Sequence, residues 1–254
     1  MIKINIAIVY FTILFSNFCI AQSDTLQYKQ VVFEKDSSLS EDNSNKLYLN
    51  ISYPIFRNYE SINNHIKSFA LSKIFESDIT LPEKEIWIKF VNEYKSIENP
   101  SALDAIGWEV QRKVSVIYNE SNLLSLKFMV YEFLGGAHGN SSVAYSTYDL
   151  SSSEMILLSD IFVADFENTL NMIAEKEFRH IRNIDKDKSF EKSGFWFNDN
   201  VFSVNDNFAV TKNGILFYFN NYEITSYANG PTKIVLPFNS LKQIIKPGGF
   251  LEGL

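Results

Sequence analysis

The chain has 254 residues, 46% of them hydrophobic, and a formal net charge of −7 at pH 7. A chain of this length and apolar content can bury a core in one domain or in two small domains packed together. Its acidic balance argues against a nucleic-acid partner, because the phosphate backbone binds cationic surfaces. The same balance is compatible with a cationic protein or ligand.

The first 21 residues are expected to be a cleaved signal peptide. Lys3 provides a minimal positive region, residues 4–15 form a nearly unbroken apolar run, and the small residues Cys19 and Ala21 precede Gln22, in the pattern that a signal peptidase reads. Removal of this segment, whose only charged residue is Lys3, changes the net charge from −7 to −8. We therefore expect cleavage after Ala21 and a periplasmic or secreted protein with no membrane span in its mature chain. An uncleaved anchor is the main alternative.

Thiol chemistry is excluded from the expected mature chain, because the only cysteine, Cys19, lies inside the signal peptide. Cysteine nucleophiles, disulfides and cysteine-based metal sites are thereby ruled out. Glu177 and His180 share one side of a helix at i,i+3 spacing, but Glu175 lies well around it, which favours a solvated helix face over a metal site. We expect no metal and no cofactor.

In the first half of the chain, strand and helix patterns succeed one another. Residues 46–53 alternate between apolar and polar side chains, as a half-buried strand does. Apolar positions at helical spacing predict a helix over residues 61–74, and His65 is expected to be exposed among its polar residues. Pro82 predicts the start of a second helix that ends near Pro100. The remaining expected elements are a strand at 28–34 and a long hairpin with strands at 106–118 and 123–131.

The second half predicts shorter strands and one long helix. Asn213 and Gly214 between two apolar runs are a strong hairpin signal. Residues 167–182 have an apolar helical face, whereas residues 190–207, rich in Asn, Asp, Ser and aromatics, predict a long irregular segment. Pro237 is expected to start a final helix that includes residues 241–245. The expected strands are 142–150, 155–158, 208–211, 215–219 and 233–236.

These elements predict an α+β fold with mostly antiparallel sheets and packed helices. We expect two intimately associated subdomains, one over residues 22–140 and one over residues 141–254. No flexible linker, internal repeat or low-complexity tract interrupts the mature chain.

A histidine within a glycine cluster is the most informative local feature. Gly135, Gly136 and Gly139 surround His138 directly after the strand-like run 123–131. Glycines this close together indicate a backbone with positive φ or a close approach. No Gly-Lys-Ser/Thr follows and no helix begins there, which argues against a phosphate loop. We interpret the cluster as a tight crossover between two central strands.

The order of motifs resembles a bacterial extracytoplasmic family of unknown function. That family is found in the ectodomain of the anti-sigma factor RsiV and ahead of the catalytic domain of the peptidoglycan deacetylase PdaC. The similar blocks cover nearly the whole mature chain in the same order. They are residues 49–54, 62–66, 131–139, 148–150, 157–162, 208–211, 214–219, 221–224, 227–230 and 235–238, with Leu241.

The resemblance implies a PdaC-like N-terminal part, an RsiV-like C-terminal part, and a non-catalytic sensing or binding module outside the cytoplasm. In the anti-sigma factor this region binds lysozyme. Two departures limit what carries over, because neither a sigma-binding part with a second membrane span nor a deacetylase domain is evident in this chain. We therefore expect neither signalling by that route nor deacetylation, since a shared fold is a poor guarantee of function.

An enzymatic role for His138 is the less favoured interpretation. Glu132 or Asp149, each within a strand's length, could orient His138 as a general base. However, no nucleophile motif such as G-x-S-x-G accompanies it. The favoured interpretation is a structural histidine that caps a turn or bonds a backbone carbonyl.

Five side chains are candidate binding residues. Tyr131 precedes the glycines and His138 lies among them. Trp196 lies in the apolar triplet of residues 195–197, inside the polar segment 190–207. Glu223 stands in an aromatic-rich region, and Tyr227 lies at the rim of a turn. Aromatic residues bury area at low entropy cost and can stack on sugar rings. The structural alternatives are that the triplet attaches the loop to the core and that Glu223 points outward from a strand.

We therefore expect an exported, non-catalytic module that binds or senses an envelope ligand or protein. A lysozyme-type or other cationic protein bound by the acidic surface is the first candidate partner. A glycan or peptidoglycan fragment is the second candidate, and a hydrolase that uses His138 ranks third.

Overall fold

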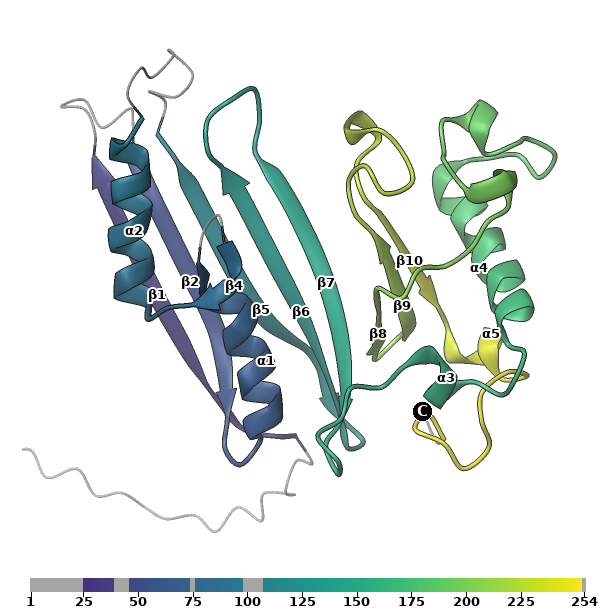
Figure 1. Ribbon diagram of the computed structural model, residues 1–254. Coiled ribbons are helices and arrows are strands. Elements are labelled where there is room, and N and C mark those ends of the chain that lie inside the picture. Colours follow the sequence, from purple (N-terminus) through teal and green to yellow (C-terminus); the bar gives the residue numbers. More distant parts are fainter. Residues whose placement is uncertain (1–24, 39–45, 74–75, 98–106, 253–254) are drawn as a thin grey trace, which may run out of the picture.

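The computed structural model describes residues 25–38, 46–73, 76–97 and 107–252 (Figure 1). The expected signal peptide, its cleavage site after Ala21 and Cys19 lie outside these ranges. Within the described ranges, no helix is long and apolar enough to cross a membrane.

The first sheet has five strands in the order β1-β2-β5-β6-β7. Neighbouring strands are antiparallel except for β2 and β5, which are parallel. A parallel pair needs a crossover connection, and helices α1 and α2 lie in the segment between these two strands. The strands are β1 Tyr28–Ser38, β2 Lys46–Phe56, β5 Glu109–Glu120, β6 Leu123–Phe133 and β7 Asn140–Asp149.

Helices α1 (Glu60–Ala70) and α2 (Glu83–Lys95) cover one face of this sheet (Figure 1). The apolar residues of α1 recur every four positions and pack with alternate residues of β2 in one core; they are Ile62, Ile66 and Ala70 on the helix and Leu47, Leu49, Ile51 and Tyr53 on the strand. The expected extension of this helix to residue 74 is wrong. The chain instead enters the small ladder of β3 (Ser72–Lys73) and β4 (Glu76–Thr80).

The second sheet has the order β10-β9-β8, with the long helix α4 packed beside it (Figure 1). Its strands are β8 Phe208–Thr211, β9 Gly214–Phe219 and β10 Thr232–Leu236. The helices of this half are α3 Leu158–Ile161, α4 Glu167–Arg182 and α5 Phe238–Leu241, with short 3-10 turns η2 Glu191–Ser193, η3 Asn198–Asn200 and η4 Tyr227–Asn229.

Both expected hairpins are present. Strands β5 and β6 are joined by Ser121 and Asn122, which both have positive φ (53° and 61°), as a two-residue turn that matches the strand twist requires. Strands β8 and β9 are joined at Lys212 and Asn213.

Other expected elements also differ in the structure. The second helix, expected to end near Pro100, ends at Lys95. The strand predicted over residues 155–158 is reduced to one bridge between Tyr148 and Met155, because the Asp160 carboxylate accepts a hydrogen bond from the Leu157 N–H and the chain turns into α3. The final helix is also shorter than predicted, since α5 ends at Leu241.

Each of the two larger sheets has its own hydrophobic core, and the chain is α+β with mostly antiparallel strands, as expected. The second core also takes in Tyr118 and Leu123 from the first sheet, so the two halves are packed together. The predicted boundary between residues 140 and 141 falls at the start of β7, which pairs with β6 in the first sheet. The division into domains at that point stays a prediction.

Strand β7 lies at the edge of its sheet and faces the second half of the molecule (Figure 1). The glycine cluster was interpreted as a crossover between two central strands, and this is corrected to a link between β6 and an edge strand.

The free edge of β7 is satisfied by two asparagine side chains. The amide of Asn207 accepts from the Tyr145 N–H (2.8 Å) and donates to the Val143 carbonyl (2.8 Å). Asn220 accepts from the Val143 N–H (2.7 Å) and donates to the same carbonyl (3.0 Å). These two side chains take the place of a further strand, which protects the edge from pairing with another chain.

His65 on α1 is exposed, as expected, yet it contacts two aromatic side chains. Its ring stacks on Phe128 at 5.0 Å and its Nδ1 lies 2.5 Å from the Tyr148 hydroxyl. Burial lowers the pKa of His65 and raises the pKa of Tyr148 to about 12. His65 and Tyr148 thus form a side-chain hydrogen bond between α1 and β7 in the folded protein.

A lowered pKa of His65 predicts a loss of stability in mild acid. The unfolded chain, with a pKa of about 6.5, binds a proton more readily than the folded one, so stability is complete above this value and falls as the pH drops through it. Urea unfolding at pH 7.5 and pH 5.5 measures the effect, and NMR titration measures the pKa itself. The variant His65→Phe is expected to show a smaller pH dependence, and a measured pKa of His65 at or above 6.5 would contradict the prediction.

Candidate functional site

Two loops meet at the same end of the two sheets, and they bring together residues that were selected separately from the sequence. The loop of residues 134–139 joins β6 to β7, and residues 220–231 join β9 to β10 (Figure 1). Each loop belongs to a different sheet, so the region between them is shared by both halves of the protein.

The contact between the loops is an aromatic stack. The rings of His138 and Tyr227 lie nearly parallel, with centroids 4.3 Å apart and an interplanar angle of 19°. The Tyr227 hydroxyl donates to the carbonyl oxygen of Gly139 at 3.1 Å, and His138 Nδ1 lies 3.0 Å from the same carbonyl oxygen. His138 is exposed and Tyr227 is half-buried, so the stack lies at the protein surface.

The glycines of the first loop have two different roles, in the backbone turn and in the packing of Tyr131. Gly135 and Gly136 have φ of 92° and 94°, which only glycine adopts readily. A Cβ on Gly139 would overlap the hydroxyl and ring of Tyr131. Burial, and then the nearby Glu109 and Tyr227, raise the pKa of Tyr131. Gly135 and Gly136 therefore serve the turn, and Gly139 leaves room for Tyr131.

Tyr222 extends this group and was not among the residues selected from the sequence. Its ring lies 5.6 Å from that of Tyr227, 55% of its surface is exposed, and its φ is 62°. A non-glycine residue with positive φ is uncommon, and for a bulky one it costs free energy that the surrounding turn must supply. We call Tyr131, His138, Tyr222 and Tyr227 the aromatic cluster. The turn-like sequence of Asn220 and Asn221 before Tyr222 was the available signal.

Trp196 lies beside the second loop. Its backbone N–H donates to the Ile224 carbonyl at 2.8 Å, while its side chain is 54% exposed. Its neighbours Phe195 and Phe197 pack into the second core. The apolar triplet therefore attaches the loop to the core through its two phenylalanines, and Trp196 alone is presented to solvent.

Glu223 has a structural task in the turn. Its two carboxylate oxygens accept hydrogen bonds from the Asn205 side chain (2.6 Å) and from the Asn220 N–H (2.7 Å). It thereby fixes Asn220, whose side chain binds the edge of β7. A ligand-binding role for Glu223 stays a prediction, and a ligand would have to compete with these bonds.

Arg182 at the end of α4 fixes the other side of the second loop. Its guanidinium donates to the carbonyl oxygens of Asn229, Gly230 and Pro231 and to the hydroxyl of Thr232. Burial lowers the pKa of Arg182. The segment that carries Tyr227 is thus held by several charge-assisted hydrogen bonds.

The carboxylates proposed to orient His138 are engaged elsewhere. Glu132 lies 3.9 Å from the buried Arg112. Asp149 is at the opposite end of β7, where burial alone would raise its pKa, but hydrogen bonds from Ser151 and Ser152 lower the pKa overall. Neither carboxylate contacts His138, and the geometry gives the general-base interpretation no support.

Glu175 of α4, which was considered with Glu177 and His180 as a metal ligand, is likewise engaged elsewhere. Glu175 pairs with Arg179 at 2.7 Å, at i,i+4 spacing. Among the described residues, no group of three or more His, Cys, Asp or Glu side chains is arranged to hold a metal ion.

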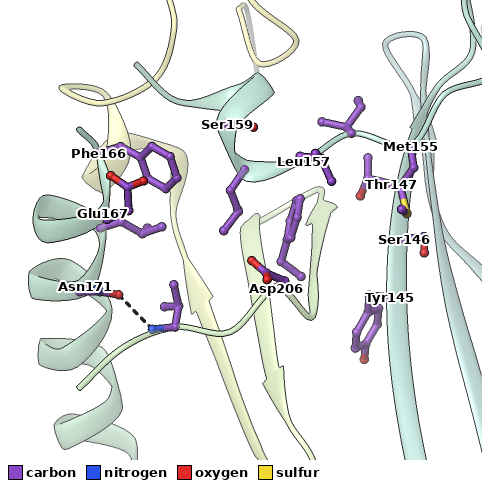
Figure 2. Close-up of a pocket in the computed structure, with 15 residues that line it drawn as sticks. Tyr145, Ser146, Thr147, Met155, Leu157, Ser159, Phe166, Glu167, Asn171 and Asp206 are labelled. Atoms are coloured by element: carbon purple, nitrogen blue, oxygen red, sulfur yellow. Dashed lines mark hydrogen bonds between the residues drawn. The ribbon is translucent and has the colours of Figure 1, made fainter. Parts of the chain in front are cut away.

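A separate cavity of about 480 Å³ lies between β7, the α3 segment and the start of α4 (Figure 2). Its walls are largely apolar, with Glu167 and Asp206 among the polar lining residues. The sequence did not reveal this cavity, because its lining comes from four separate segments that only the tertiary fold brings together.

Comparison with known proteins relates the two halves to two families. Residues 40–141 match the family described as deacetylase PdaC, and residues 159–239 match the family described as a protein of unknown function, DUF3298. The resemblance expected from the sequence blocks is thereby confirmed at the level of the family. The particular likeness to the anti-sigma factor RsiV stays a prediction.

One curated relative is the peptidoglycan-N-acetylmuramic acid deacetylase PdaC of Bacillus subtilis (strain 168). It is 27% identical over 198 residues, which are 77% of this chain and 38% of that protein. The chain therefore spans well under half the length of this relative.

Two solved structures of DUF3298 family members have a similar fold. The protein from Bacteroides fragilis NCTC 9343 is 20% identical with a TM-score of 0.67, over 91% of this chain and 99% of that one. The protein from Pseudomonas aeruginosa PAO1 is 19% identical with a TM-score of 0.66, over 89% of this chain and 96% of that one. At these identities the likeness shows the fold alone.

Proposed function

For a chain that combines a PdaC-type segment with a DUF3298 segment, we propose an exported, non-catalytic binding module of the cell envelope. Its ligand surface is the aromatic cluster, with Trp196 beside it, and its ligand is a cell-wall glycan or peptidoglycan fragment.

The observation that carries this proposal is the exposed stack of His138 on Tyr227. Aromatic faces present an apolar surface with polar edges, which suits the alternating apolar and hydroxyl-bearing surfaces of sugar rings. The loops are held by Arg182 and by Glu223, so little ordering entropy would be lost on binding.

The similarity to the peptidoglycan deacetylase supports a wall-related ligand. Deacetylation is a property of that relative, of which this chain spans 38%. A non-catalytic role is further supported by His138, whose partners among the described residues are a backbone carbonyl and an aromatic ring.

The variant Tyr227→Ala is expected to weaken glycan binding about fivefold or more, because a central aromatic anchor contributes over about 1 kcal/mol. Calorimetric titration with soluble peptidoglycan fragments measures this. Tyr227→Phe keeps the ring and loses only the hydrogen bond to Gly139, so it should bind nearly as well as the wild type.

The matched control is Tyr28→Ala, which removes an aromatic side chain that is 47% exposed on β1 and should leave binding unchanged. Thermal unfolding of each variant shows whether its fold is intact. Equal affinities of the wild type and a folded Tyr227→Ala variant would contradict the proposal.

A cationic envelope protein, such as a lysozyme-type protein, is the second candidate ligand. The net charge of −7 favours it, because complementary charge accelerates association. Titration with lysozyme at low and high salt separates the candidates. Binding of lysozyme that disappears at high salt, without binding of glycan fragments, would favour the protein partner.

A further inference from the structure

The cavity between the two halves lies away from the aromatic cluster and has a distinct chemistry. Tyr145 and Thr147 of β7 form one wall, and Phe166, Glu167 and Asn171, at the start of α4, form the opposite wall (Figure 2). Its volume of about 480 Å³ is within the range of small-ligand sites, about 300–1,000 Å³.

The apolar part of the cavity reaches the surface. Met155 and Leu157, which belong to its lining, are 48% and 52% exposed. Buried Leu158 and Phe208 continue the apolar lining inward. An aliphatic group entering the cavity would therefore be removed from water.

The charged groups of the lining are all acidic. Glu167 projects from the first turn of α4, and Asp206 from the segment before β8 (Figure 2). Neither carboxylate has a hydrogen bond or ion pair with another described residue, and the lining contains no lysine, arginine or histidine. Lys246 lies near this end of the cavity, and its ammonium donates to the carbonyl oxygen of Ser159 at 2.7 Å.

We propose that this cavity binds an alkylammonium group, a short aliphatic chain that ends in a protonated amine, as in a lysine-type side chain. The chain packs against Met155, Leu158 and Phe208, and the ammonium group pairs with Glu167 and Asp206. An anionic ligand would be repelled by the same carboxylates. This site is independent of the aromatic cluster and of the ligand proposed for it.

Three probes of equal length test the charge requirement at pH 7: pentylamine, 1-pentanol and pentanoate. Amide chemical shifts in a ¹⁵N-labelled protein report binding at residues 145–147 and 155–159. Pentylamine should saturate these shifts, pentanol should bind about fivefold or more weakly, and pentanoate should not bind. Equal affinities for pentylamine and pentanol would overturn the proposal.

Substitution of the carboxylates tests their role. Glu167→Gln and Asp206→Asn keep the side-chain shape, and each should weaken pentylamine binding about two- to fivefold, as exposed ion pairs do. The double variant should bind pentylamine no better than pentanol. Glu191→Gln, an exposed acid outside the cavity lining, is the matched control and should have no effect. An unchanged affinity in the folded double variant would also overturn the proposal.

A peptide arm distinguishes the source of the amine. A lysine peptide with an acetylated N-terminus and a free lysine side chain differs from its norleucine counterpart only in the side-chain ammonium group. Selective binding of the lysine peptide identifies a peptide side chain as the source, whereas selective binding of free pentylamine alone identifies a small amine. Both results support the alkylammonium class.

Discussion

Asn207→Ala is expected to lower the free energy of unfolding by about 1–2 kcal/mol, and the double variant Asn207→Ala/Asn220→Ala by about 2–4 kcal/mol. The two amides satisfy the N–H and carbonyl groups of Val143 and the N–H of Tyr145 at the free edge of β7. Removing both side chains leaves these groups without protein partners. Urea unfolding measures the change, and hydrogen exchange at Val143 and Tyr145 should accelerate.

Two control variants distinguish the loss of these edge contacts on β7 from a general effect of replacing asparagine. Asn168→Ala removes an exposed asparagine on α4 and should change stability by no more than about 0.5 kcal/mol. Asn207→Asp keeps the acceptor for Tyr145 but faces the carbonyl oxygens of Val143 and Tyr218 with a carboxylate. It should therefore destabilise at least as much as alanine. Unchanged exchange at Val143 and Tyr145 in the double alanine variant would contradict the assignment.

Phe178→Ala is expected to cost about 3–5 kcal/mol, the largest effect of a single substitution. Phe178 is fully buried on α4, and its ring centroid lies 5.0–5.7 Å from those of Phe190, Phe195, Phe197 and Phe202. Truncation leaves a cavity and removes these aromatic pairs together. The midpoint of urea unfolding at constant slope measures the loss.

Met172→Ala on the same helix is the matched control. Met172 is 67% exposed, so its truncation should change stability by no more than about 0.5 kcal/mol. A loss below about 1 kcal/mol for Phe178→Ala would show that the second core is not organised around this ring.

Local patterns in the sequence were sufficient to predict most of the fold. The hairpin turn at Ser121 and Asn122 and the turn at Asn213 lie between apolar, strand-like runs, and both hairpins form. The helix predicted over residues 167–182 is α4 with the same bounds. These features depend on residues close in sequence, which is why period and turn chemistry identify them.

Features that depend on distant residues were not predictable in the same way. The parallel pairing of β2 with β5 and the capping of β7 by Asn207 and Asn220 join segments far apart in the chain. The Asn-rich composition of residues 190–207 predicted only an irregular segment. Its specific bonds to an edge strand require the tertiary arrangement.

In the candidate site, too, the residue types could be selected from the sequence, but their arrangement in space could not. Tyr131, His138 and Tyr227 could be selected from the sequence as aromatic residues near turns, but their convergence depends on the meeting of two loops from different sheets. Glu223 was selected for its acidic charge, and its carboxylate is occupied by the turn. Tyr222 was missed because its left-handed backbone conformation is not evident from residue type.

The most direct test of the central claim is to map glycan binding residue by residue with amide chemical shifts. If both halves of the protein form one ligand surface, a soluble peptidoglycan fragment should shift the amides of residues 134–139 and of residues 220–231 with a single affinity. Shifts confined to one of these loops, or found only elsewhere on the protein, would contradict the claim.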